Sequence, residues 1–181
     1  MITDRELYEQ YLLGSKKAFE EMVIRHKNNI IYFITRYVKD IQIAEDISQD
    51  VFVYLLVKPE QYDFKYSLKT YLYMIAKCRA INYIKRESKI SHMTETIDIP
   101  DSKELEDLVF SKNISENVRK TINKLKQSYQ LIIYLVDFEG MSYNEVAQIM
   151  GKSLGQVKST LYNARQQLKS FLEKEEMKYE G

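Results

Sequence analysis

Apolar residues recur at intervals of three and four through most of this chain, which is the spacing of the buried face of a helix. Near the N-terminus, Thr3 and Glu6 have the spacing of a capping box and predict a short helix that runs to Gly14. Ser15 then provides the cap of a long helix that extends to Val38. The chain is therefore predicted to begin with two helices.

A third helix is predicted over residues 41–57, with Pro59 as the residue that ends it. Its apolar stripe has spacings of 4, 4 and 3 and consists of Ile43, Ile47, Val51 and Tyr54. A loop follows, and Ser67 caps a fourth helix that runs to about Glu87. The residues that this fourth helix is expected to bury are Leu68, Leu72, Ile75, Ala76, Ala80 and Ile84.

The stretch from residue 88 to about residue 102 has weak periodicity, and we interpret it as a linker. Helical periodicity resumes near Lys103 and continues to about Leu125. A further helix is predicted over residues 128–138. The pattern thus divides the chain into two helical halves.

Two further capping boxes lie close together in the second half. Ser142 and Glu145 open a short helix, and Gly151 suits the left-handed turn that ends it. Ser153 and Gln156 open a longer helix. The apolar stripe of this longer helix has spacings of 3, 4, 3 and 4 and consists of Leu154, Val157, Leu161, Ala164 and Leu168. Two helices joined by a short glycine turn predict a helix-turn-helix.

The face opposite this stripe carries polar groups suited to DNA, namely Gln156, Lys158, Ser159, Tyr162 and Arg165. Gln and Lys side chains can bond base edges, and Ser, Lys and Arg side chains can hold phosphates. We therefore favour DNA recognition over an ordinary helical hairpin with a solvated face.

Composition agrees with a helical protein and narrows its class. Of 181 residues, 5 are glycine and 2 are proline, which favours long helices over a sandwich or a low-complexity chain. The longest apolar runs fall far below the roughly 20 residues of a membrane span, and the N-terminus lacks a signal-peptide pattern. One cysteine and two distant histidines exclude an internal disulfide and an ordinary zinc site. We expect a soluble, cytoplasmic, all-α protein without a metal.

The net charge of +1 hides an uneven distribution of charge. Residues 65–89 contain seven basic side chains and one acid, and residues 152–169 contain four basic side chains and no acid. Between them, residues 91–107 contain six acids and one lysine. Local blocks set the field that a DNA phosphate feels within about 8–10 Å, so the two basic blocks favour nucleic acid over merely solvated faces.

The helix-turn-helix segment resembles the C-terminal promoter-reading domain of bacterial RNA polymerase sigma factors. The matching runs are YQLII at 129–133, EGMSYNEVA at 139–147, MGKS at 150–153, QVKS at 156–159 and LYNAR at 161–165. By itself, this segment is also similar to the output domain of a two-component regulator.

The N-terminal half separates these two families. The run AEDISQDVF at 44–52 resembles the polymerase-docking helix of sigma factors. TYLYMIAK at 70–77 and AINYIKR at 80–86 resemble their minus-ten-reading helix. Both motifs in this order, with a linker and no further central domain, are similar to the extracytoplasmic-function (ECF) group of the sigma-70 family. The departures from the family pattern are Tyr71, Cys78 and Asn82, where Trp, Asn and Asp are usual.

The resemblance implies two small helical domains joined by a flexible linker. The first domain, residues 1–88, would dock on polymerase and recognise and melt the minus-ten element. The second domain, residues 103–175, would carry the helix-turn-helix for the minus-thirty-five element. Residues 89–102 would form the acidic linker, and residues 176–181 a tail.

The same resemblance assigns three groups of site residues. Asp46, Gln49 and Asp50 are expected to bind a basic coiled coil of the largest polymerase subunit. The residues expected at the minus-ten element are Tyr62, Phe64, Tyr66, Lys69, Tyr73, Lys77, Lys85 and Arg86. Aromatic rings there would stack on an unstacked base, and cations would follow the phosphates. The residues expected at the minus-thirty-five element are Ser153, Gln156, Lys158, Ser159 and Arg165.

The implied partners are core RNA polymerase, promoter DNA and an anti-sigma factor, with no cofactor, no small-molecule substrate and no membrane insertion. The alternative is a dimeric helix-turn-helix regulator that never joins polymerase, which would need only one DNA-binding surface. An enzyme is the third class. The sequence contains no glycine-rich phosphate loop, metal cluster or activated nucleophile, so we expect no catalytic activity.

Overall fold

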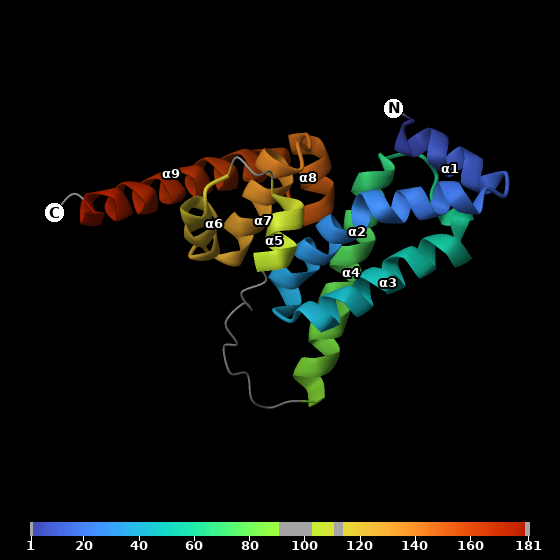
Figure 1. The fold of residues 1–181 in the computed structure, drawn as a ribbon, viewed down its shortest axis with the longest axis horizontal. Helices are drawn as coiled ribbons and strands as arrows, with labels where there is room; N and C mark the ends of the chain where they lie inside the picture. The colour runs from blue at the N-terminus through green and yellow to red at the C-terminus, as the bar shows by residue number, and fades with distance from the viewer. Residues whose placement is uncertain (1, 91–102, 111–113, 180–181) are drawn as a thin grey trace. The chain divides into compact units, whose positions relative to one another are not determined.

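The computed structural model describes residues 2–90, 103–110 and 114–179, and every regular element within these ranges is a helix. The chain divides into two compact units, Met1–Val109 and Phe110–Gly181 (Figure 1). The first unit contains α1 (Asp4–Leu12), α2 (Lys16–Val38), α3 (Ile41–Val57), the 3-10 turn η1 (Pro59–Gln61), α4 (Leu68–Ile90) and α5 (Lys103–Val109). The second contains α6 (Glu116–Asn123), α7 (Gln127–Ile133), the π-helical turn η2 (Tyr134–Phe138), α8 (Tyr143–Met150) and α9 (Leu154–Tyr179). The predicted all-α fold class is confirmed.

Side-chain caps fix where the first three helices begin. Thr3 and Glu6 form the predicted capping box at α1, in which the Glu6 N–H donates to Thr3 Oγ1 at 3.2 Å. Ser15 caps α2 as predicted, and Asp40 caps α3 by accepting the Ile43 N–H at 3.0 Å. The predicted limits of α2 and α3 therefore agree with the structure.

Helix α2 is the centre of the first unit and contacts α1, α3, α4 and α5. All residues from 31 to 36 are buried, since neighbouring helices surround this part of α2. Helix α4 buries Leu68, Leu72, Ala76 and Ala80 as predicted. Ile84 is instead 38% exposed, because α4 extends beyond the helices that cover it and residues 84–89 are all exposed.

Helix α5 belongs to the first unit because it packs on α2. Leu105 is buried, and Glu106 accepts a hydrogen bond from the buried Arg36 at 3.5 Å. The units therefore divide after Val109, and not at Lys103, where periodicity placed the start of the second domain.

The helical periodicity predicted from Lys103 to about Leu125 belongs to two helices in the structure, α5 and α6. Ser115 begins α6 by accepting the Val118 N–H at 3.3 Å. The two helices bury their apolar residues in different units, since Leu105 of α5 is buried in the first unit and Ile122 of α6 is buried in the second. Periodicity alone could not separate two helices whose apolar faces serve different cores.

The helix predicted over residues 128–138 also has two parts. Helix α7 ends at Ile133, and the next turn is a π-helix in which the Glu139 N–H donates to the Tyr134 carbonyl at 2.9 Å. Residues that form the core of the second unit include Ile122, Leu131, Ile132, Leu135, Val146, Val157, Leu161 and Ala164.

The two C-terminal capping boxes form as predicted. Ser142 and Glu145 open α8, and Gly151 ends it with a φ of 65°. Ser153 opens α9, whose bounds reach Tyr179 and so include the first residues of the predicted tail. The predicted acidic linker lies outside the described residues from residue 91 onward.

None of the helices within the described ranges is both long enough and apolar enough to cross a membrane.

Candidate functional site

The three predicted docking residues lie on the outer side of α3. Asp46, Gln49 and Asp50 are all exposed, and Asp46 and Asp50 are one helical turn apart. Asp50 also lies 3.9 Å from Arg79 of α4, although the two side chains are 66% and 34% exposed. Such an exposed pair contributes about 0–1 kcal/mol, so Asp50 remains available to another cation.

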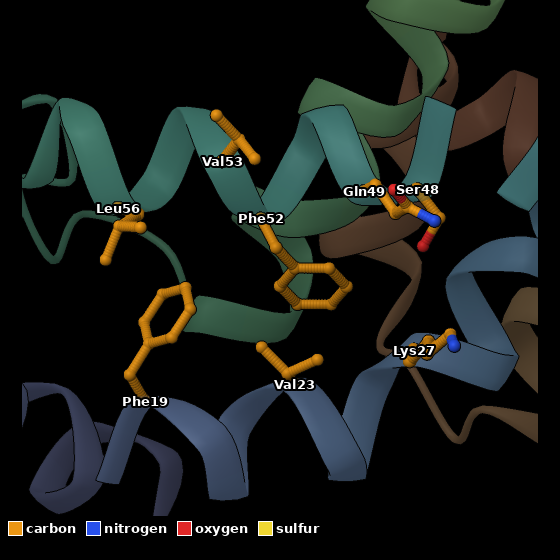
Figure 2. A pocket seen from close by; sticks show the side chains of 8 residues that line it. All are labelled: Phe19, Val23, Lys27, Ser48, Gln49, Phe52, Val53 and Leu56. Atoms are coloured by element: carbon orange, nitrogen blue, oxygen red, sulfur yellow. The ribbon is translucent and has the colours of Figure 1, made fainter. Parts of the chain in front are cut away.

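An apolar groove between α2 and α3 adjoins these docking residues. It has a volume of about 370 Å³. Its lining residues are Phe19, Val23 and Lys27 of α2 and Ser48, Gln49, Phe52, Val53 and Leu56 of α3 (Figure 2). Ser48 is buried, and its hydroxyl has no hydrogen-bond partner within the described structure.

Gln49 joins the groove to the acidic positions, so charge and apolar surface meet on α3. Val53 and Leu56 are 53% and 48% exposed, and with the other apolar residues of the groove they form a contiguous apolar surface, a feature that is typical of interaction sites. This groove was not predicted from the sequence, because the periodicity of residues 41–57 indicated only one apolar face. The signal was present, since Val53 and Leu56 fall outside the predicted buried stripe.

Helix α4 presents one polar face to solvent. Cys78, Asn82, Lys85 and Lys89 recur at spacings of 4, 3 and 4 and are all exposed, and Arg86 lies beside them. The predicted DNA residues Lys85 and Arg86 therefore share one accessible surface. Lys69 and Lys77 are half-exposed.

Tyr73 does not belong to this surface, and its predicted contact with the DNA strand is wrong for this structure. The ring is fully buried and packs edge-on against Phe33 of α2, with centroids 4.8 Å apart. It lies one position from Leu72 and three from Ala76, both of which are also buried. Tyr73 is a core residue that holds α4 on α2.

The three aromatic residues of the loop before α4 have different surroundings. Tyr62 is 6% exposed, packs edge-on against Tyr8 at 4.9 Å, and donates its hydroxyl to the Tyr66 carbonyl at 2.8 Å. Burial raises the pKa of Tyr62 above its ordinary value. Tyr62 is thus an anchor for the loop and is not accessible to a base.

Phe64 and Tyr66 are both half-exposed. Phe64 has a φ of 60°, which is rare for a residue with a side chain. Its ring lies 5.7 Å from that of Tyr8, and the Arg5 guanidinium lies 5.2 Å from its centre. Lys65 brings a positive charge 5.4 Å from the Tyr66 ring. Phe64 and Tyr66 are therefore the two rings of this loop that remain partly accessible, and we call them the accessible aromatic pair.

At the N-terminus of α9, Ser153 and Gln156, which were predicted to contact DNA, form the helix cap with each other. The Ser153 N–H donates to Gln156 Oε1 at 2.9 Å, and the Gln156 N–H donates to Ser153 Oγ at 3.2 Å. The Ser159 hydroxyl donates to the Gln156 carbonyl at 3.2 Å. Gln156 is exposed, but its amide oxygen already has a partner, so it offers fewer bonds to a base than the sequence suggested.

Arg165 is engaged within the second unit. Its guanidinium forms two hydrogen bonds with the carboxylate of Asp137 in the π-helical turn, one of them 3.2 Å long from Nε. The bond to Asp137 is the main reason that the pKa of Arg165 is raised above its ordinary value. Lys158 and Tyr162 are exposed on α9, and Leu154 is 40% exposed, contrary to its predicted burial.

Comparison with known proteins agrees with this two-unit arrangement. Residues 22–90 match the family description "Sigma-70 region 2", and residues 115–168 match "Sigma-70, region 4". RNA polymerase sigma factor YlaC of Bacillus subtilis is 30% identical, with 88% of this chain and 94% of that protein covered. The ECF RNA polymerase sigma-E factor of Escherichia coli K12 is 27% identical, with coverage of 91% and 92%.

A solved structure of CnrH in complex with the cytosolic domain of CnrY has the same fold. It superposes with a TM-score of 0.64 at 23% identity and covers 94% of this chain and 97% of that one. A helical region 2 followed by a helix-turn-helix region 4 defines a transcription initiation factor. The chain belongs to the sigma-70 family of RNA polymerase sigma factors, in its ECF group. The family resemblance read from the sequence is confirmed.

Proposed function

We propose that this sigma factor uses three surfaces. Helix α3 binds polymerase, α4 with its preceding loop melts the minus-ten element, and α9 recognises the minus-thirty-five element. The observation that carries this proposal is the placement of exposed acidic residues on α3 and of exposed basic residues on α4 and α9. A dimeric regulator that never joins polymerase would need only one DNA-binding surface.

Polymerase docking is assigned to α3 and the groove beside it. Asp46 and Asp50 complement a basic coiled coil and speed and orient the encounter. The apolar groove with Val53 and Leu56 supplies surface that both partners remove from water. The acidic side chains thus fix how α3 aligns on polymerase, and burial of the apolar groove contributes to the affinity of the complex.

Strand opening is assigned to the accessible aromatic pair, Phe64 and Tyr66. Stacking a base on an aromatic ring contributes about 1–3 kcal/mol, which is comparable with the cost of unstacking it. Lys85 and Arg86 follow the phosphates of the same strand. Tyr62 and Tyr73 serve the scaffold, since both are buried.

The remaining partners follow from this role. The relatives CnrH and RpoE were solved with CnrY and with the anti-sigma factor NepR, which supports an anti-sigma partner for this chain. We place the protein in the cytoplasm, where core polymerase works, and assign it no catalytic reaction of its own.

The test of this function is binding to core polymerase. Asp46→Lys combined with Asp50→Lys should weaken co-purification with core enzyme at least tenfold in moderate salt, because both positions are exposed and the fold does not depend on them. Glu116→Lys combined with Glu173→Lys, an equal change of charge at exposed positions of α6 and α9, is the matched control. Circular dichroism checks that the variants are folded.

Full-strength co-purification of the double variant would show that α3 does not dock through its acids. If wild-type protein binds promoter DNA as a dimer and does not bind core enzyme in gel filtration, the regulator alternative replaces the sigma-factor mechanism.

A further inference from the structure

Gly155 is the one glycine in the described residues whose presence the fold does not explain by a left-handed turn. Gly14, Gly140 and Gly151 have φ values of 99°, 66° and 65°, which side chains rarely adopt. Gly155 is not in this region, because it is the second residue of helix α9.

Internal packing does not require a glycine at this position either. A Cβ atom built on Gly155 meets no described atom within 4 Å, apart from its chain neighbours and the backbone of its own helix. Glycine is also a poorer helix former than alanine. In the free protein, therefore, position 155 has space for a side chain, and alanine there would stabilise the helix relative to glycine.

The surface around Gly155 is the polar face of α9. Lys158, Ser159 and Tyr162 follow it at i+3, i+4 and i+7, and all are exposed. Gly155 thus begins the row of side chains that faces away from Val157 and Leu161, which are buried. In a helix-turn-helix, the N-terminal part of the second helix enters the major groove.

We infer that Gly155 is the point at which the backbone of α9 comes closest to promoter DNA, and that its missing side chain lets the helix sit deeply enough for Lys158 and Ser159 to reach base edges. Gly155 is a positioning residue, because it acts through its neighbours. This inference rests on the proposed function, since it requires α9 to bind the minus-thirty-five element.

The experiment uses the full chain bound to core polymerase. The probes are a promoter duplex that the wild-type holoenzyme selects from genomic fragments and a second duplex in which only the upstream element is scrambled. The variants are Gly155→Ala and Gly155→Val. The control is Ser170→Thr, which adds one methyl group to α9 about 22 Å further along the helix.

Gly155→Ala should unfold at a temperature no lower than wild type, yet bind the selected duplex at least tenfold more weakly. Its affinity for the scrambled duplex should stay within twofold of wild type, because phosphate attraction does not need deep insertion. Gly155→Val should lose at least a hundredfold, and Ser170→Thr should match wild type.

Two results overturn the inference: unchanged affinity of Gly155→Ala for the selected duplex, or a fall in its unfolding temperature, which would give Gly155 a purely structural role. A wild-type holoenzyme that selects no duplex would overturn the proposed function instead, so the two failures are distinguishable.

Discussion

Phe64 offers a way to separate folding from strand opening, because its backbone conformation and its ring have different roles. The residue has a φ of 60°, and this left-handed conformation costs a residue with a side chain about 1–2 kcal/mol. We compare Phe64→Ala, which keeps this cost, with Phe64→Gly, which removes it.

The expected difference follows from three contributions. Both variants lose the burial of a half-exposed ring, which is worth about 1 kcal/mol when a fully buried Phe is worth about 1.5–3. Phe64→Gly regains about 1–2 kcal/mol of backbone strain and gives up about 0.4–1 kcal/mol to the greater freedom of the unfolded chain. Phe64→Gly should therefore be about 0.5–1 kcal/mol more stable than Phe64→Ala, the reverse of the usual order.

Urea unfolding followed by circular dichroism measures this difference, and permanganate footprinting of minus-ten thymines measures opening. Opening should fall equally in both variants, because neither has a ring, and a pre-melted promoter bubble should restore transcription. Phe64→Tyr, which retains a ring, should open DNA normally. A Gly variant less stable than the Ala variant would refute the strain argument, and normal opening by either would refute base capture by Phe64.

Three further outcomes are expected. The hydrogen bond from His26 lowers the pKa of the Asp4 carboxyl group. The ionised carboxylate therefore stabilises the fold fully above about pH 4, and this stabilisation is lost as the pH falls through the lowered pKa. Asp4→Asn should cost about 1–2 kcal/mol in urea at pH 6, and the gap should close in acid. Gln156→Ala should lower the free energy of unfolding by about 1 kcal/mol in thermal unfolding, whereas Gln156→Glu should keep the helix cap. If both variants lose base preference in a panel of promoter variants, Gln156 contacts a base. Arg165→Ala should weaken binding to all sequences alike and flatten the log-affinity versus log-salt slope by about 1, whereas Asp137→Ala should tighten binding in the same titrations.

The predictable parts of this fold depend on residues that are close in the sequence. A capping box joins two side chains three residues apart, so Thr3 with Glu6 and Ser142 with Glu145 could be identified without tertiary information. The family resemblance was equally accessible, because its motifs are short runs on single helices.

The missed features depend on residues that are far apart. Asp137 and Arg165 are separated by 28 positions, and only the π-helical turn and the packing of α9 bring them together. Tyr73 looked like a DNA residue because it lies in a basic, aromatic helix, and its burial against Phe33 follows from the way α4 packs on α2. Residue type indicated the chemistry, but packing decided which residues can use it.

The loop before α4, which carries Tyr62, Phe64 and Tyr66, packs against helix α1, and the region 2 family match does not include α1. The region 2 match begins at residue 22, so α1 lies outside it. Yet the Tyr8 hydroxyl of α1 donates to the Pro59 carbonyl at 2.7 Å, and the Tyr8 ring packs on both Tyr62 and Phe64. Asp4 in turn ties α1 to α2 through His26. Because α1 carries none of the residues assigned to DNA or polymerase, loosening it should reduce strand opening while polymerase binding persists.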